Sequence, residues 1–201
     1  MSLEAHWYST MFGWYNLAAL LVTGFAAVAL TVILLNESGY FPWITPNHLH
    51  DLGKLMFGFS IFWTYLWFSQ FFLTWYANIP EESVYYYTRW LPEFKPWFWL
   101  NIVVCFVAPL LLLMSRDAKR LYGRMKLASI VIILGHWLDY YLMVMPGTVK
   151  AEGRGFGVEE ICIFLGFAGL FVFLMLNALS KFTSLIPKKH PFLDESLHHH
   201  I

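Results

Sequence analysis

Five apolar stretches separated by short polar segments dominate the pattern of this chain. They cover residues 14–35, 55–75, 97–114, 127–144 and 158–179. About 20 apolar residues in a helix span the hydrocarbon core of a bilayer, so each stretch predicts a transmembrane helix. No internal repeat or low-complexity linker separates them. The pattern therefore predicts an all-α integral membrane protein, with a five-helix transmembrane bundle in residues 1–180 and a C-terminal tail in residues 181–201.

The fourth stretch contains two polar side chains near its middle. His136 and Asp139 are three residues apart, which places them on one helix face, close enough to interact. A charge at that depth costs from roughly 2.5 to more than 10 kcal/mol, and such residues mark functional sites by default. We expect a pair that exchanges a proton, because burial opposes the Asp139 anion whereas a charged His136 supports it. The alternative is a polar pair that joins this helix to its neighbours by hydrogen bonds.

Polar residues elsewhere predict a path to this pair. The full set expected along the path is His136, Asp139, Tyr140, Tyr141, Asp51, Lys54, Thr64, Tyr65, Gln70, Glu159 and Glu160. Asp51 and Lys54 are three apart and are expected to pair, and the two glutamates would mark an outer opening. Two structural explanations stay open: acids in a first turn favour the helix dipole, and polar residues of the second stretch serve helix–helix hydrogen bonds. The path also requires the second and fifth stretches to pack against the His136 face.

Composition supports a membrane protein and narrows its chemistry. The chain is 59% hydrophobic and 13% charged, whereas about a quarter of the residues of a soluble domain are charged. Zero net charge and the lack of a basic run leave nucleic-acid binding without support. Cys105 and Cys162 lie in apolar stretches and are interpreted as small apolar residues. No haem-attachment motif, cysteine cluster or metal-ligand set is present, so no cofactor or metal is expected in this chain.

The distribution of basic residues predicts the orientation. Lys54, segment 115–126 and the C-terminal tail hold nine of the thirteen basic residues. The positive-inside rule then places the C-terminus in the cytoplasm and the Met1 end in the periplasm. Residues 1–13 contain no signal peptide. We therefore expect the intact protein to have earlier spans before this first helix.

Three segments resemble one family. They are MSLEAHWYSTMFG at residues 1–13, HLHDLGKLMFGFSIFWTYLWFSQFFLTWYANIPEE at residues 48–82 and HPFLDESLHHHI at residues 190–201. The chain resembles the C-terminal half of the ActF-type membrane subunits of bacterial alternative complex III, which belong to the NrfD/PsrC-like (polysulfide reductase) family. The resemblance covers nearly the whole chain. It implies the second half of a fold of roughly ten helices, namely a four-helix bundle plus one peripheral helix.

The resemblance also implies a setting for the chain. It would be a multi-pass subunit, in the bacterial inner membrane, of a respiratory complex that oxidises menaquinol or ubiquinol and passes electrons towards cytochrome c or a terminal oxidase. The expected partners are a paralogous NrfD-like ActC-type subunit, multihaem cytochrome c and iron–sulfur subunits, in some cases a terminal oxidase, and membrane lipids. Haem c and iron–sulfur clusters would belong to those partners. This subunit would lack catalytic residues, support assembly and offer a transmembrane proton route.

Three other functions stay open on the sequence. The chain could be a quinone-binding subunit in its own right, with aromatic walls and His136 at the quinone head group. It could be a purely structural anchor whose buried polar residues only pack helices. A secondary transporter has less support, because matched Gly/Pro breaks in paired helices, a sign of transporters, are not evident.

Overall fold

The computed structural model describes residues 3–4, 7–149, 156–182 and 191–197, and their regular structure is helical, with no strand. The elements are α1 Met11–Glu37, α2 Pro46–Ala77, α3 Pro80–Arg89, α4 Lys95–Ile102, the π-helical η1 Val103–Val107, α5 Ala108–Leu113, the 3-10 turn η2 Ala118–Arg120, α6 Tyr122–Val149, α7 Val158–Ser180 and α8 Leu193–Leu197.

Four of the helices are long and apolar enough to cross a membrane. They are Met11–Glu37, the continuous rod Lys95–Leu113, Tyr122–Thr148 and Val158–Ser180. The all-α prediction is thus confirmed, and these four helices make a multi-pass membrane protein plausible. The remaining predicted span, the second stretch at residues 55–75, lies within α2, which has 32 residues. Helix α2 is not one of the four, because tryptophan, tyrosine, serine, threonine and glutamine lower its hydropathy.

Local signals explain why α2 starts well before the predicted span. Thr45 precedes the helix in extended conformation and Pro46 occupies its first turn, a combination that favours helix initiation. The backbone N–H of Thr45 donates to Nδ1 of His48 at 3.0 Å. Helix α2 ends at Asn78, whose φ of 49° is left-handed.

The bundle core joins α1, α2, α6 and the α4–α5 rod. Small residues of α1 face inward and are fully buried, among them Ala18, Ala19, Ala26 and Ala29, which lets the neighbouring helices approach closely. Gly135 plays this part on α6, since a Cβ there would lie 2.8 Å from Cγ1 of Val104. The rod widens into η1 just before Pro109, which cannot donate to the helical ladder.

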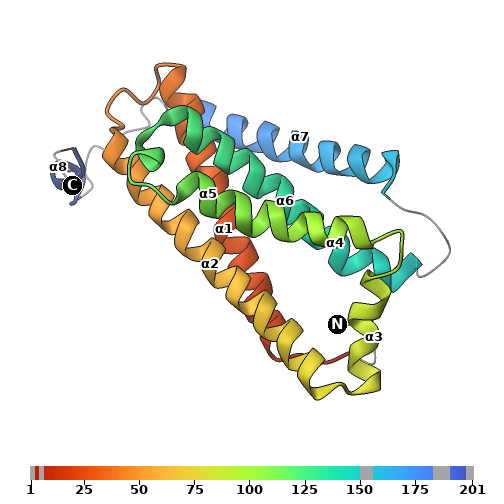
Figure 1. The fold of residues 1–201 in the computed structure, drawn as a ribbon. Coiled ribbons are helices and arrows are strands. Elements are labelled where there is room, and N and C mark those ends of the chain that lie inside the picture. The colour runs from red at the N-terminus through yellow and green to blue at the C-terminus, as the bar shows by residue number, and fades with distance from the viewer. Residues whose placement is uncertain (1–2, 5–6, 150–155, 183–190, 198–201) are drawn as a thin grey trace.

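Helix α7 is peripheral. It has no buried residue and runs alongside α6 (Figure 1). The two helices touch through the rings of Trp137 and Phe164, whose centroids are 4.7 Å apart. Helix α7 thus lies at the edge of the bundle.

The two ends of the bundle differ. At one end, here called the α3 end, α3 follows the end of α2 and contacts α2 and α6. At the other, the loop end, α1 connects to α2 and α5 connects to α6 (Figure 1). Part of the predicted tail docks at the loop end, where His48 Nε2 lies 3.0 Å from the carbonyl oxygen of Ser196 in α8. Residues 183–190 and 198–201 of that tail lie outside the described residues.

Candidate functional site

The carboxylate of Asp139 is the centre of the buried polar cluster. Its Oδ1 accepts a hydrogen bond from the hydroxyl of Tyr15 at 2.5 Å and another from Nδ2 of Asn101 at 2.9 Å. Its Oδ2 accepts from Nε1 of Trp63 at 3.3 Å. The donors come from α1, α4 and α2, and the residue is only 2% exposed. One side chain of α6 therefore connects all the other helices of the bundle core.

His136 lies beside this carboxylate without bonding to it. Its Nδ1 is 3.9 Å from Oδ2 of Asp139, so the spacing argument for one shared face is confirmed. Neither ring nitrogen has a hydrogen-bond partner among the described residues, and the side chain is 1% exposed. The ring meets the Trp63 ring edge-on at 5.2 Å between centroids. Buried polar groups normally have hydrogen-bond partners, so this histidine is an exception and a candidate functional residue.

A small cavity opens from Asp139 towards the α3 end. It measures about 30 Å³ and also touches Tyr15, Gln70, Tyr85 and Arg89. That volume exceeds the roughly 10–15 Å³ that a water molecule requires, and the lining supplies polar partners. Gln70 is thus the polar residue of α2 that reaches the site, as predicted. His136 does not line this cavity.

A buried ion pair separates this cavity from a second one. Arg89 donates to Oε1 of Glu4 at 2.9 Å, to the Tyr85 carbonyl at 2.6 Å and to the Met143 carbonyl at 3.2 Å. Its guanidinium also lies 3.3 Å from the centroid of the Tyr85 ring. Glu4 lines a second cavity of about 220 Å³, which shares Tyr85 and Met143 with the first. Burial raises the pKa of Tyr85 to about 12, so its hydroxyl stays protonated at neutral pH.

Several predicted path residues do not reach the site. Tyr65 is 61% exposed on the outer face of α2. Thr64 donates to the carbonyl of Ser60 within its own helix at 2.8 Å. Asp51 and Lys54 form the expected pair, at 2.6 Å, but on the exposed surface at the loop end. These side chains form no line leading to His136.

The predicted outer opening is also displaced. Glu160 accepts from the Gly157 backbone N–H at 2.8 Å and caps α7, and Glu159 is exposed. Helix α7 meets the neighbouring Trp137 rather than the His136 face, so the packing that the path required is absent from the described fifth span. Tyr140 is partly exposed beside the larger cavity. Tyr141 is buried, and its hydroxyl has no hydrogen-bond partner.

The three residues that donate hydrogen bonds to Asp139, namely Tyr15, Trp63 and Asn101, were not predicted from the sequence. Asn101 is the one amide side chain in the stretch 97–114, and that isolation was a usable signal. Tyr15 and Trp63 gave none, because tyrosine and tryptophan are common in membrane helices near the interfaces. The described residues contain no group of three or more His, Cys, Asp or Glu side chains suited to a metal.

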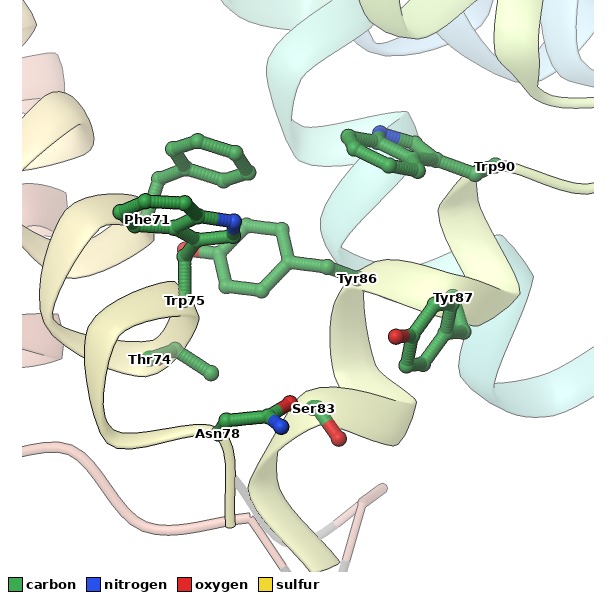
Figure 2. A pocket seen from close by; sticks show the side chains of 8 residues that line it. All are labelled: Phe71, Thr74, Trp75, Asn78, Ser83, Tyr86, Tyr87 and Trp90. Carbon is green, nitrogen blue, oxygen red and sulfur yellow. The ribbon is translucent and has the colours of Figure 1, made fainter. Parts of the chain in front are cut away.

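An aromatic pocket lies nearby at the α3 end. Figure 2 shows the rings of Phe71, Trp75, Tyr86 and Trp90 around it, with Asn78 at its lower edge. Its volume of about 60 Å³ is small beside the roughly 300–1,000 Å³ typical of ligand pockets. Tyr86 borders both this pocket and the cavity at Asp139. The pocket thus gives only slight support to a quinone site.

Comparisons with known proteins add no identification. No protein-family model matches the chain, and no curated protein matches its sequence.

Proposed function

We propose that this chain is a membrane subunit of a quinol-oxidising respiratory complex of the alternative complex III type, and that Asp139 holds and passes a proton for that complex. Helix α2 would then be a fifth span. Membership of this complex is supported by the three segments of the sequence that resemble ActF-type subunits. The proton role rests on one observation: a carboxylate sits nearly inaccessible at the centre of the bundle, bound by three helices, with a cavity leading from it towards the α3 end.

The hydrogen bonds around Asp139 allow two protonation states. Trp63 and Asn101 present N–H donors to the carboxylate, and the Asn101 oxygen already accepts from Cys105 at 3.1 Å. Tyr15 differs, because a hydroxyl both donates and accepts. A protonated Asp139 would donate to the Tyr15 oxygen, and the Tyr15 hydrogen would turn into the adjoining cavity. The cluster can thus change charge without moving a helix.

The route opens in one direction. From Asp139 it runs through the small cavity, past Arg89 and Tyr85, to Glu4 and the larger cavity at the α3 end. On the loop side of His136 the buried core is mostly apolar, with Met56, Met125 and Ile132. The two buried hydroxyls there, of Ser60 and Ser129, donate to carbonyl oxygens of their own helices. We propose a half-channel that exchanges protons with the α3 end, the side that the charge distribution assigns to the periplasm.

A structural anchor is the second candidate. The same three hydrogen bonds join α1, α2 and α4 to α6 whether or not a proton moves. This function explains Asp139 but not His136, whose buried nitrogens have no hydrogen-bond partner within the described ranges.

Membership of the complex predicts what co-purifies with the chain. Mass spectrometry of the protein purified in mild detergent should find multihaem cytochrome c and iron–sulfur subunits in fixed proportion to it. Those subunits carry the electron-transfer groups for which this chain has no ligands. Recovery of the chain alone, or only with unrelated proteins, would remove the respiratory assignment and leave the proton site to be tested separately.

The substitution Asp139→Asn tests the proton role. Asparagine keeps the shape and an acceptor oxygen but cannot ionise. We expect an assembled complex that still oxidises quinol, while proton translocation in vesicles falls at least about tenfold, since a positioned proton-transfer group commonly contributes ~10²-fold or more. Asp51→Asn, the same change at an exposed aspartate, is the matched control and should translocate normally. Equal proton release per electron in Asp139→Asn and wild type would leave the anchor function in place.

A further inference from the structure

A buried lysine without a carboxylate partner lies at the loop end. Lys119 is 7% exposed, and its stem crosses α2 at Gly53, where a Cβ would lie 3.0 Å from its Cβ and Cγ. The ammonium contacts the carbonyl of Met114 at 3.4 Å and the Phe57 ring at 5.1 Å from its centroid. Buried charges in proteins are usually paired. Within the part of the chain that the structure describes, no acid pairs with this one.

A buried histidine shares this environment. His50 lies one turn from Gly53 and Lys54 on α2 and is 7% exposed. Its Nδ1 has no hydrogen-bond partner in the part of the chain that the structure describes. Burial lowers the pKa of His50, and the charges of Lys54, Arg120 and Lys119 lower it further, with Asp51 alone opposing them. Burial and then Lys54 also lower the pKa of Lys119. Of the cations near these two buried groups, Lys54 pairs with Asp51 at 2.6 Å. Lys119 has no acid partner among the described residues, so the surroundings of both buried groups carry an excess of positive charge.

The position of the cluster favours a lipid as the source of that anion. Lys119 and Arg120 belong to η2, between the end of α5 at Leu113 and the start of α6 at Tyr122. Both flanking helices are apolar enough to cross a membrane, so the cluster lies where headgroups would meet the protein. Basic sites between transmembrane helices bind anionic headgroups, and lysine is a common phosphate binder.

We propose that Lys119, His50, Lys54 and Arg120 form a binding site for a phosphate group, supplied by an anionic phospholipid of the membrane. The phosphate would accept hydrogen bonds from Lys119 and from Nδ1 of His50 and would offset the surrounding cations. The site lies at the opposite end of the bundle from the Asp139 cavity, and it does not depend on the proposed proton role.

Binding of defined lipids to the delipidated, purified complex tests the site. We expect phosphatidylglycerol to bind and to raise the thermal unfolding midpoint, and phosphatidylcholine to do neither. Lys119→Met keeps the length of the side chain and removes its charge. It should weaken phosphatidylglycerol binding about fivefold or more, since one cation near a membrane surface contributes about 1 kcal/mol. Lys181→Met, at the exposed end of α7, is the matched control and should bind normally.

Two further arms separate the outcomes. Lys54→Met changes a half-exposed side chain that pairs with Asp51, a kind of surface pair that contributes only about 0–1 kcal/mol to stability. It should weaken phosphatidylglycerol binding in the same direction. Inorganic phosphate that stabilises the complex without lipid, and loses this effect in Lys119→Met, would support the phosphate site but assign it to a soluble ligand. Equal phosphatidylglycerol affinity in wild type and in both variants would overturn the proposal, as would equal binding of phosphatidylcholine.

Discussion

Replacing Asp139 by leucine should lower the free energy of unfolding by about 2–5 kcal/mol. Leucine is close in size to aspartate but accepts no hydrogen bond. The hydroxyl of Tyr15, Nε1 of Trp63 and Nδ2 of Asn101 would each lose the acceptor they share. Hydrogen bonds between membrane helices average about 0.6 kcal/mol and reach about 1.7 kcal/mol. Three such bonds to the two carboxylate oxygens of Asp139 give the expected loss of about 2–5 kcal/mol.

Asp139→Asn should cost clearly less, and the geometry says why. Both short bonds converge on Oδ1, from Tyr15 at 2.5 Å and Asn101 at 2.9 Å. An asparagine oxygen in that position keeps both, and its NH₂ group replaces only the acceptor of the 3.3 Å bond from Trp63. Thermal or denaturant unfolding in detergent should rank wild type, asparagine and leucine in that order.

The control for this ranking is the same substitution at an exposed aspartate. Asp51 pairs with Lys54 on the surface, and such pairs contribute about 0–1 kcal/mol. Asp51→Leu should therefore change stability little. A leucine variant at Asp139 that is as stable as wild type would mean that the three donors find other partners. The Asp139 carboxylate would then not be needed to stabilise the bundle.

The helices were predictable because hydropathy is a local property of the chain. Four predicted spans coincide to within a few residues with the four long apolar helices, and the second predicted span, 55–75, falls within α2. Helix α2 begins before the predicted span because Thr45 and Pro46 favour initiation there, a signal that hydropathy does not contain. The predicted polar line along α2 failed at Tyr65 for a reason visible in the helical period. Trp63 and Gln70 are seven residues apart and face the core, which turns Tyr65 outward.

The site was predictable only in part, because its contacts join distant helices. The spacing of His136 and Asp139 determines their proximity, since one helix carries both. The partners of Asp139 come from three other helices, and their side-chain directions depend on how the bundle packs. Arg89 escaped notice for the same reason. In sequence it is one charge in an aromatic interfacial segment, whereas in the fold it is 3% exposed and bound to residues of the N-terminal segment and α6.

The buried pair of Glu4 and Arg89 should show strong energetic coupling. The Arg89 side chain is 3% exposed and that of Glu4 17%, and Gly147 leaves room for the Glu4 carboxylate, which would lie 2.8 Å from a Cβ at that position. Glu4→Met leaves a buried guanidinium with only backbone carbonyls and the Tyr85 ring. Breaking one side of a buried pair costs about 3–5 kcal/mol, and the partial exposure of Glu4 reduces the expected loss to about 2–4 kcal/mol.

A double-mutant cycle measures that coupling directly. Arg89→Met should cost less than Glu4→Met, because the remaining carboxylate reaches solvent while the remaining guanidinium does not. The double variant leaves neither charge, so its loss should fall short of the sum of the single losses by at least about 1 kcal/mol. Unfolding midpoints of the four proteins supply the cycle. The exposed pair of Lys126 and Glu37, joined at 2.6 Å, is the control and should couple by less than about 1 kcal/mol under the same substitutions. Additive losses at Glu4 and Arg89 would show that the pair does not hold the α3 end closed, and the barrier between the two cavities would have to come from Tyr85 and Met143 alone.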